Sequence, residues 1–348
     1  MLSKFKIFNK SSSNHKNFLQ ICFLNIYSYT EEISDNTFCV FSSINKILYL
    51  VYATKVKSII LYNLVNNEII SKIKQAHSEY ISNFRHYRDI KNKRDLIISI
   101  SGKNNNIKVW DIRDLTCLAN IENIYQNGYL YSACFINDNN NIIIAASNEN
   151  YELIKIYNLK GNQIETLNNS NYVTYFIDNF YDKESNINFI ITGNLGFCRS
   201  YMYEMNEEYG IYKDKEKNAP HCSIIIVKDS KEITKMIESS QNGIIRIWNF
   251  HSMELLVIID LNTRYEIKKI FGICLWDENN LCVGCGDDTI KLLNLNSKKF
   301  TIFDNLIGHN NNVLSIKKIM HPKYGNCLIS QDKGNSQILL WINSKFQF

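Results

Sequence analysis

The first candidates for chemistry are a cysteine pair and an acidic pair that lie close together in the sequence. Cys282 and Cys285 have the Cys-x-x-Cys spacing of zinc ligands and redox-active thiols. They lie within a predicted strand, however, where residues three apart point to opposite faces, and no second cysteine pair follows at metal-binding spacing. Asp287 and Asp288 offer two carboxylates for metal binding or acid–base chemistry, but they occupy the turn after that strand. We therefore interpret both pairs as structural.

Three histidines, His77, His221 and His309, offer imidazole nitrogens to a metal ion. They recur at one position of the repeat described below, so we interpret them as structural too. The chain contains no Gly-x-Ser-x-Gly elbow, no His-Glu-x-x-His, no phosphate-binding Gly-x-x-x-x-Gly-Lys and no dinucleotide fingerprint. We predict a protein that is not an enzyme and that uses no cofactor and no metal.

Composition indicates one globular domain. The 348 residues are 45% hydrophobic and 12% aromatic, enough for a packed core, and only two prolines occur. The net charge of +5 is modest, so composition does not demand a nucleic acid partner. Ten cysteines are far fewer than the roughly 8–10% of a disulfide scaffold. The polar N-terminus does not resemble a signal peptide, and no apolar run is long enough for a transmembrane segment. These features predict a cytoplasmic or nuclear protein.

One short phrase recurs along the chain. It reads NIKVWDIRDL at residues 106–115, where apolar and polar residues alternate up to a Trp-Asp pair. Six related phrases occur, and the aromatic residue or its replacement falls at Tyr62, Trp110, Tyr157, Tyr203, Trp248, Leu293 and Trp341. The separations of 45 to 48 residues indicate seven copies of one structural unit.

Each copy lies among short β-prone segments that are bounded by turn residues. The sixth copy has segments beginning at residues 267, 281, 289 and 300, separated by DENN, DD and NSKK. Four antiparallel strands per unit, with a Trp-Asp-like pair ending the third strand, resemble the WD-repeat family over residues 36 to 342. The resemblance implies an all-β fold, a seven-bladed β-propeller of four-stranded antiparallel blades.

The resemblance also implies a buried hydrogen-bonded chain within a blade, formed by a His, a Ser or Thr on the second strand, an Asp in the following turn, and the Trp. The fullest set is His309, Ser330, Asp332 and Trp341. The next is His77, Ser101, Asn104 and Trp110. Trp110 and Trp248 are expected to be buried between blades.

The ring of blades has to close, because an open ring exposes two unpaired sheet edges. We predict that the segment 18–27 supplies the last strand of the seventh blade, with the C-terminal tail as the competing donor. The domain division is then a flexible N-terminal tail at 1–16 and one propeller at 17–348.

Two surfaces are candidates for partner binding. The first is basic and lies in what we predict to be a long connection between the first two strands of the second blade: Arg85, Arg88, Lys91, Lys93 and Arg94. The second is a set of residues just before first strands, which the resemblance places on the rim of the narrow face: Tyr80, Tyr172, Arg264 and Tyr265.

The resemblance implies a rigid scaffold that binds other proteins or peptides, as a subunit or adaptor of a larger intracellular complex. The alternative is a propeller that binds an anionic ligand, a phosphoinositide membrane surface or a nucleic acid, through the basic connection. Phosphoinositide-binding propellers carry a Phe-Arg-Arg-Gly motif, whereas this chain has FCRS at 197–200 with a single arginine. The sequence identifies neither the partner nor the oligomeric state.

Overall fold

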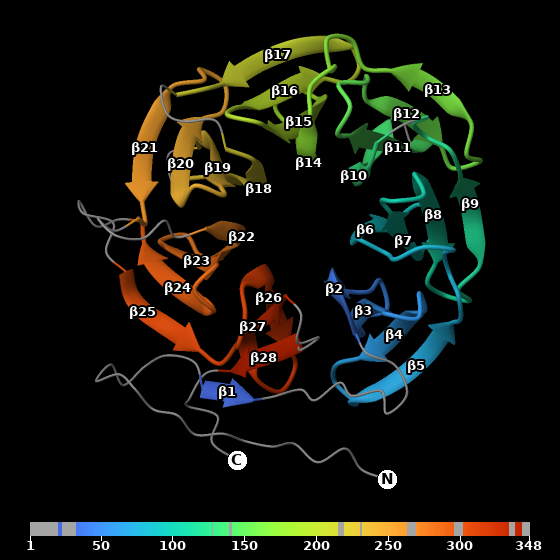
Figure 1. The fold of residues 1–348 in the computed structure, drawn as a ribbon, viewed down its shortest axis with the longest axis horizontal. Helices are drawn as coiled ribbons and strands as arrows, with labels where there is room; N and C mark the ends of the chain where they lie inside the picture. Colours follow the sequence, from blue (N-terminus) through green and yellow to red (C-terminus); the bar gives the residue numbers. More distant parts are fainter. Residues whose placement is uncertain are drawn as a thin grey trace.

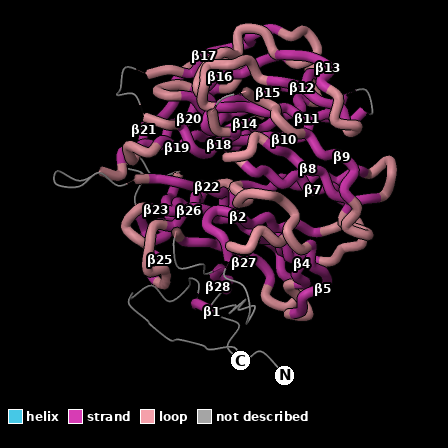
Figure 2. Tube along the Cα trace, turned by 45° about the vertical axis from the view of Figure 1, so that its right-hand side comes forward, coloured by secondary structure: helices cyan, strands magenta, loops and turns pink. Residues whose placement is uncertain are grey.

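The computed structural model describes residues 20–22, 33–126, 128–138, 141–214, 219–229, 232–262, 269–295, 302–333 and 338–342. The described strands form seven four-stranded antiparallel sheets that are arranged in a ring (Figure 1). The protein is therefore a seven-bladed β-propeller, as the sequence predicts. The described residues include no helix (Figure 2). There is therefore no helix among them that is long and apolar enough to cross a membrane.

The blades are numbered here from the first to the seventh along the chain. The first three are β2 (Ile33–Ser42), β3 (Leu48–Thr54), β4 (Ile59–Asn63) and β5 (Glu68–Ile73); β6 (Asn83–Asp89), β7 (Arg94–Ser101), β8 (Asn106–Asp111) and β9 (Cys117–Ile121); and β10 (Leu130–Asp138), β11 (Asn141–Asn148), β12 (Lys155–Asn158) and β13 (Gln163–Thr166). The next two are β14 (Thr174–Asp182), β15 (Ile187–Asn194), β16 (Cys198–Met202) and β17 (Glu207–Tyr212); and β18 (His221–Lys228), β19 (Thr234–Ser240), β20 (Ile244–Asn249) and β21 (Leu255–Asp260). The last two are β22 (Ile270–Asp277), β23 (Asn280–Cys285), β24 (Thr289–Asn294) and β25 (Ile302–Ile307); and β26 (Val313–His321), β27 (Gly325–Asp332) and β28 (Ile338–Ile342) with β1 (Gln20–Cys22).

The seventh blade joins the two ends of the propeller. Its sheet has the order β1-β28-β27-β26, so β1 is its outermost strand (Figure 1). β1 pairs antiparallel with β28 through Gln20 opposite Ile342 and Cys22 opposite Leu340. These three residues belong to the segment 18–27, in which we expected the closing strand. The predicted flexible tail at 1–16 and the competing C-terminal tail at 343–348 lie outside the described residues.

The core is a ring of seven apolar interfaces, one between each pair of neighbouring blades. Successive residues of a strand point to opposite faces of the blade, so each blade contributes to two interfaces. Cys282 on β23 packs toward the seventh blade, while Cys285 packs toward the fifth. Both cysteines are fully buried and lie in different interfaces, as expected for strand residues three apart. Trp110 and Trp248 are also buried, as expected.

A β-bulge marks the repeat position in six blades. The pairing of the third strand with the fourth shifts immediately before Tyr62, Trp110, Tyr157, Tyr201, Trp248 and Leu293. In the fourth blade the repeat position is therefore Tyr201, and the sequence-based choice of Tyr203 is wrong by two residues. Two residues along a strand return to the same face, so the alternating pattern alone cannot separate these tyrosines.

The His, Ser and Trp part of the predicted hydrogen-bonded chain is confirmed in the seventh blade. Ser330 Oγ lies 2.6 Å from His309 Nε2 and accepts the indole N–H of Trp341 at 2.7 Å. His309 Nδ1 lies 3.5 Å from an Asp332 carboxylate oxygen. These four side chains are buried, so the chain links the connection before β26 to β27 and β28. Asp332 is the last residue of β27 and does not lie in the turn that follows.

In the second blade the same chain uses a different serine from the one predicted. Ser99 Oγ lies 2.7 Å from His77 Nε2 and accepts the indole N–H of Trp110 at 2.8 Å. Trp110 faces Ile97 on β7, so Ser99 occupies the place of Ser330, while Ser101 corresponds to Asp332. The choice of Ser101 and Asn104 is therefore wrong, because the strand-to-strand register, which sets these positions, was misjudged by two residues.

The two serines of β7 give a matched test of this hydrogen-bonded chain. Replacing Ser99 with Ala leaves the buried donor of Trp110 and the ring nitrogen of His77 without their partner. We expect the free energy of unfolding to fall by about 1–3 kcal/mol in denaturant titrations. Ser101→Ala should have little effect, because the buried Ser101 hydroxyl has no hydrogen-bond partner among the described residues. Equal losses in the two variants would contradict the assignment.

Candidate binding surface

The topology places two kinds of connection on opposite faces of the ring. In each blade from the first to the sixth the chain runs from the inner first strand outward to the fourth (Figure 1). Because these strands are antiparallel, the turn between the second and third strands and the connection to the next blade share one face, which we call the interblade face. The turns that join the first strand to the second and the third to the fourth lie on the other face, the hairpin face.

A groove of about 1000 Å³ lies on the interblade face across the first two blades and the connection to the third. It is formed by the β3–β4 and β7–β8 turns together with the connections β5–β6 and β9–β10. Carboxamide side chains make up much of its lining: Gln75, Asn104, Asn105, Asn106, Asn123 and Gln126. Asn105 and Asn123 have φ values of 50° and 52°, a left-handed conformation that Asn tolerates better than most residues. The turn geometry thus explains part of this amide-rich composition.

Charged residues of the groove are mostly cationic. Lys57, Lys103 and Lys108 line it, and Glu122 is the acid among the described lining residues. The Lys108 ammonium donates to the backbone carbonyl of Ala76 at 2.8 Å, whereas the Lys103 side chain is 72% exposed. The groove can therefore offer amide hydrogen bonds together with positive charge to a ligand.

The exposed aromatic Tyr80 lies beside the groove on the β5–β6 connection. The Lys57 ammonium donates to the backbone carbonyl of Ser78 and lies 5.8 Å from the centre of the Tyr80 ring. The Asn104 amide donates to the Ser78 hydroxyl. Turns from two blades therefore hold the connection in place, while 56% of the Tyr80 surface remains exposed.

His77 forms part of the groove floor but is held by the fold. The imidazole is buried, and its Nε2 contacts Ser99. Burial and the positive charge of Lys108 lower the pKa of His77 to about 4, although a hydrogen bond with Asn106 acts to raise it. The ring is therefore neutral near pH 7.

The second predicted tyrosine contacts a different set of residues. Tyr172, on the connection β13–β14, packs over the guanidinium of Arg199 at 3.9 Å and against the edge of Phe197 at 5.4 Å. Tyr80 precedes the second blade and Tyr172 precedes the fourth, and the third blade lies between these two blades. Arg264 and Tyr265 lie outside the described residues.

Sequence analysis missed three tyrosines that pack together at the start of inner strands. Tyr131 lies 5.6 Å from Tyr129 and 5.2 Å from Tyr175, measured between ring centres. The Tyr131 hydroxyl donates to Glu149 at 3.1 Å. Burial, together with Glu149, raises the pKa of Tyr131 to about 12, so this hydroxyl stays protonated. Part of the signal was present in the sequence, because Tyr175 lies three residues after Tyr172 and Tyr129 directly precedes the first strand of its blade.

The basic residues of the second blade do not form one long loop. β6 ends at Asp89 and β7 begins at Arg94, so the connection is the short turn 90–93. Arg85 and Arg88 belong to β6, which makes the prediction of a long loop wrong. The alternation of RHYRD within this stretch is compatible with a strand, but its charge suggested a loop.

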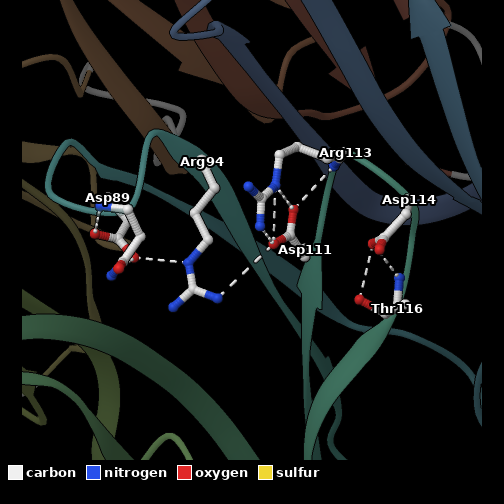
Figure 3. A network of polar contacts seen from close by, with 7 residues as sticks. Asp89, Arg94, Asp111, Arg113, Asp114 and Thr116 are labelled. Carbon is white, nitrogen blue, oxygen red and sulfur yellow. Dashed lines mark hydrogen bonds and ion pairs between the residues drawn. The ribbon is translucent and has the colours of Figure 1, made fainter.

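Arg94 belongs to a polar network on the hairpin face (Figure 3). It donates to Asp89 at 2.7 Å and lies 3.8 Å from Asp111, which also binds Arg113 at 2.7 Å. Burial opposes ionisation of Asp89, but hydrogen bonds from Arg94 and Asn92 outweigh it and lower the pKa of this carboxyl. Arg94 is thus used to neutralise buried acids of its own blade.

Arg85 points toward the axis of the ring. Its guanidinium lies 5.3 Å from the ring of Phe176, on the inner strand of the fourth blade. The second and fourth blades are not neighbours, so their side chains can meet only near the axis of the ring. The strand register places six inner-strand residues in the same layer as Arg85: Cys39, Cys134, Asp178, Ile225, Cys274 and Lys317. The exposed cations of the basic segment are therefore Arg88, Lys91 and Lys93.

Comparison with known proteins identifies no relative: no protein-family model matches the chain, and no curated protein matches it.

The depressed pKa of His77 predicts a pH dependence of stability. An unfolded histidine takes up a proton below pH about 6.5, whereas folded His77 resists protonation down to about pH 4. Its contribution is complete above pH 6.5 and is lost as the pH falls through that window, by up to roughly 3 kcal/mol. NMR titration should place the His77 midpoint near pH 4, and His77→Gln should show a shallower loss of stability between pH 6.5 and 4. A midpoint near 6.5 would show that the ring is accessible to protons.

Proposed function

We propose that the protein is a non-enzymatic interaction scaffold, and that the groove on its interblade face binds an extended, acidic segment of a partner protein. The observation that carries this proposal is the lining of the groove. An extended backbone can exchange hydrogen bonds with the exposed carboxamides of the groove, those of Gln75, Asn123 and Gln126. Lys57 and Lys103 match acidic side chains. Exposed Tyr80 at the edge adds the kind of aromatic surface that is enriched at binding hot spots.

The non-enzymatic part of the proposal rests on how the reactive groups of the groove are used. His77 is buried and bonded to Ser99, and Glu122 has no second carboxylate beside it among the described lining residues. A general acid or base has to reach the substrate. Neither group is arranged for that role.

We further propose that this propeller is of the WD-repeat type. In its support, the His, Ser and Trp of the second and seventh blades form the hydrogen-bonded chain that the resemblance implies, and Trp110 is followed by Asp111. Nine of the ten cysteines are described as free thiols, in keeping with a reducing compartment such as cytoplasm or nucleus. A subunit or adaptor of a larger complex fits these features.

The alternative, an anionic membrane surface or nucleic acid bound at the hairpin face, is the weaker candidate. Of the five cations predicted there, Arg94 is neutralised by Asp89 and Asp111, and Arg85 points to the ring axis. Only three exposed cations remain of the five: Arg88, Lys91 and Lys93.

The groove can be tested with a displayed library of random peptides selected on the full-length chain. We expect enrichment of acidic peptides, with binding measured by fluorescence anisotropy. Lys57→Glu combined with Lys103→Glu should weaken binding by about tenfold or more, since two attractive charge contacts become repulsive. The affinity should also fall as salt is raised.

The matched control reverses two cations on the opposite face, Arg88→Glu with Lys91→Glu. This variant should keep the affinity of the wild type, and thermal melting should show that both variants are folded. Selection of peptides without acidic residues, or an equal loss in the hairpin-face variant, would overturn the proposal. Binding of anionic vesicles or oligonucleotides that depends on Arg88 and Lys91 would support the alternative.

A further inference from the structure

Three potential metal ligands converge in the interface between the fourth and fifth blades. Cys198 lies on β16, and His221 and Glu238 lie on β18 and β19. His221 Nδ1 is 3.3 Å from Cys198 Sγ and 2.7 Å from a carboxylate oxygen of Glu238, and all three donor atoms lie within 4.8 Å of one another. The three side chains are buried, with residue exposures of 0 to 3%.

Glu238 replaces a neutral residue of the repeat. It lies two residues beyond Met236, which faces Trp248, and this is the position of Ser99 and Ser330 in their blades. In the other six blades the same register gives a residue without charge: Tyr52, Ser99, Ala146, Thr192, Val283 and Ser330. The exchange leaves the buried indole nitrogen of Trp248 without a hydrogen-bond partner among the described residues. The need to satisfy the indole therefore does not explain the carboxylate, which lies opposite Arg246 on β20.

Cys198 is a second departure from the repeat, and it lies at the same place. It precedes the repeat position Tyr201 by three residues, and in the other six blades this position is isoleucine: Ile59, Ile107, Ile154, Ile245, Ile290 and Ile338. The fourth blade alone has a sulfur there, and it faces the one blade that has a carboxylate in place of the serine. Two independent substitutions thus bring ligands to one histidine nitrogen.

Hydrogen bonding at His221 Nδ1 can satisfy only one of its two contacts at a time. His221 Nδ1 can hold a single proton, yet it faces both the sulfur of Cys198 and the oxygen of Glu238. A metal ion contacts all three atoms at once. The other oxygen of Glu238 lies 3.3 Å from the guanidinium of Arg246, which also donates to Asp214. A ligating carboxylate commonly has such a hydrogen-bonded partner behind it.

The charges are also suited to a divalent cation. With Cys198 as thiolate and His221 neutral, the three ligands Cys198, His221 and Glu238 together carry two negative charges. This equals the charge that a divalent metal brings. The thiol proton leaves to solvent when the metal binds, because thiolate is the form that ligates.

We propose that Cys198, His221 and Glu238 bind a zinc ion that ties the fourth blade to the fifth. Thiolate, imidazole and carboxylate are the zinc ligand set, and sulfur argues against magnesium or calcium. Three protein ligands leave one tetrahedral position for a water molecule. Since the site is buried, its role is structural, and the metal has to enter before the two blades are fully packed.

The test uses the full-length chain and two variants that restore or mimic the repeat. Wild type expressed with zinc should contain about one zinc ion per chain by elemental analysis. Glu238→Ser restores the serine of the repeat, and Cys198→Ser keeps nearly the size of the cysteine. Both should lose most of the zinc while staying folded. A zinc chelator should lower the melting temperature of the wild type and leave that of Glu238→Ser unchanged.

Cobalt substitution and a neighbouring thiol supply the control. A cobalt-loaded wild type should show the thiolate-to-cobalt charge-transfer absorption, and Cys198→Ser should not. Cys222→Ser should retain it, because Cys222 adjoins His221 in sequence but donates to the carbonyl of Pro220. The proposal is overturned if the wild type takes up neither zinc nor cobalt, or if Cys222→Ser loses the metal as Cys198→Ser does.

Discussion

Every blade of this propeller has two apolar faces, and both have to be covered by neighbours. Because successive residues of a strand point to opposite faces, a strand such as β23 sends Cys282 into one interface and Cys285 into another. A row of such sheets can cover all its faces only by returning to its start. The ring, the pairing of β1 with β28 and the seven separate core clusters are consequences of this one requirement.

Polar side chains inside this ring are tolerated where they satisfy one another's hydrogen-bonding groups. Ser330 serves both His309 and Trp341, and Ser99 serves His77 and Trp110, so each buried hydroxyl satisfies two partners. The fifth blade keeps the histidine and the tryptophan but replaces the serine with Glu238. Placing a carboxylate there makes electrostatic balance, supplied by Arg246 and its neighbours, a condition for packing the two blades.

The sequence predicts the features that repeat from blade to blade, but it does not predict positions that depend on the register between paired strands. The period, the four strands of each unit and the burial of Trp110 follow from alternation and turn residues. The choices of Ser101 and Tyr203 fail, because positions two residues apart share a face and only pairing separates them. The contact of Arg85 with Phe176 joins blades that no local pattern relates. The convergence of Cys198 on Glu238 becomes visible only after the blades are aligned by their bulges.

The composite seventh blade bears on how the chain is made. On the ribosome, β1 emerges before the other described strands and cannot pair with β28 until the strands between them have been synthesised. Until then the growing chain carries at least one uncovered sheet edge, the kind of surface that promotes aggregation. Contacts between segments so distant in sequence are also slow to form. Completion of the ring therefore has to wait until all seven blades have been synthesised, and the interval before it is the period in which the chain most needs protection by chaperones.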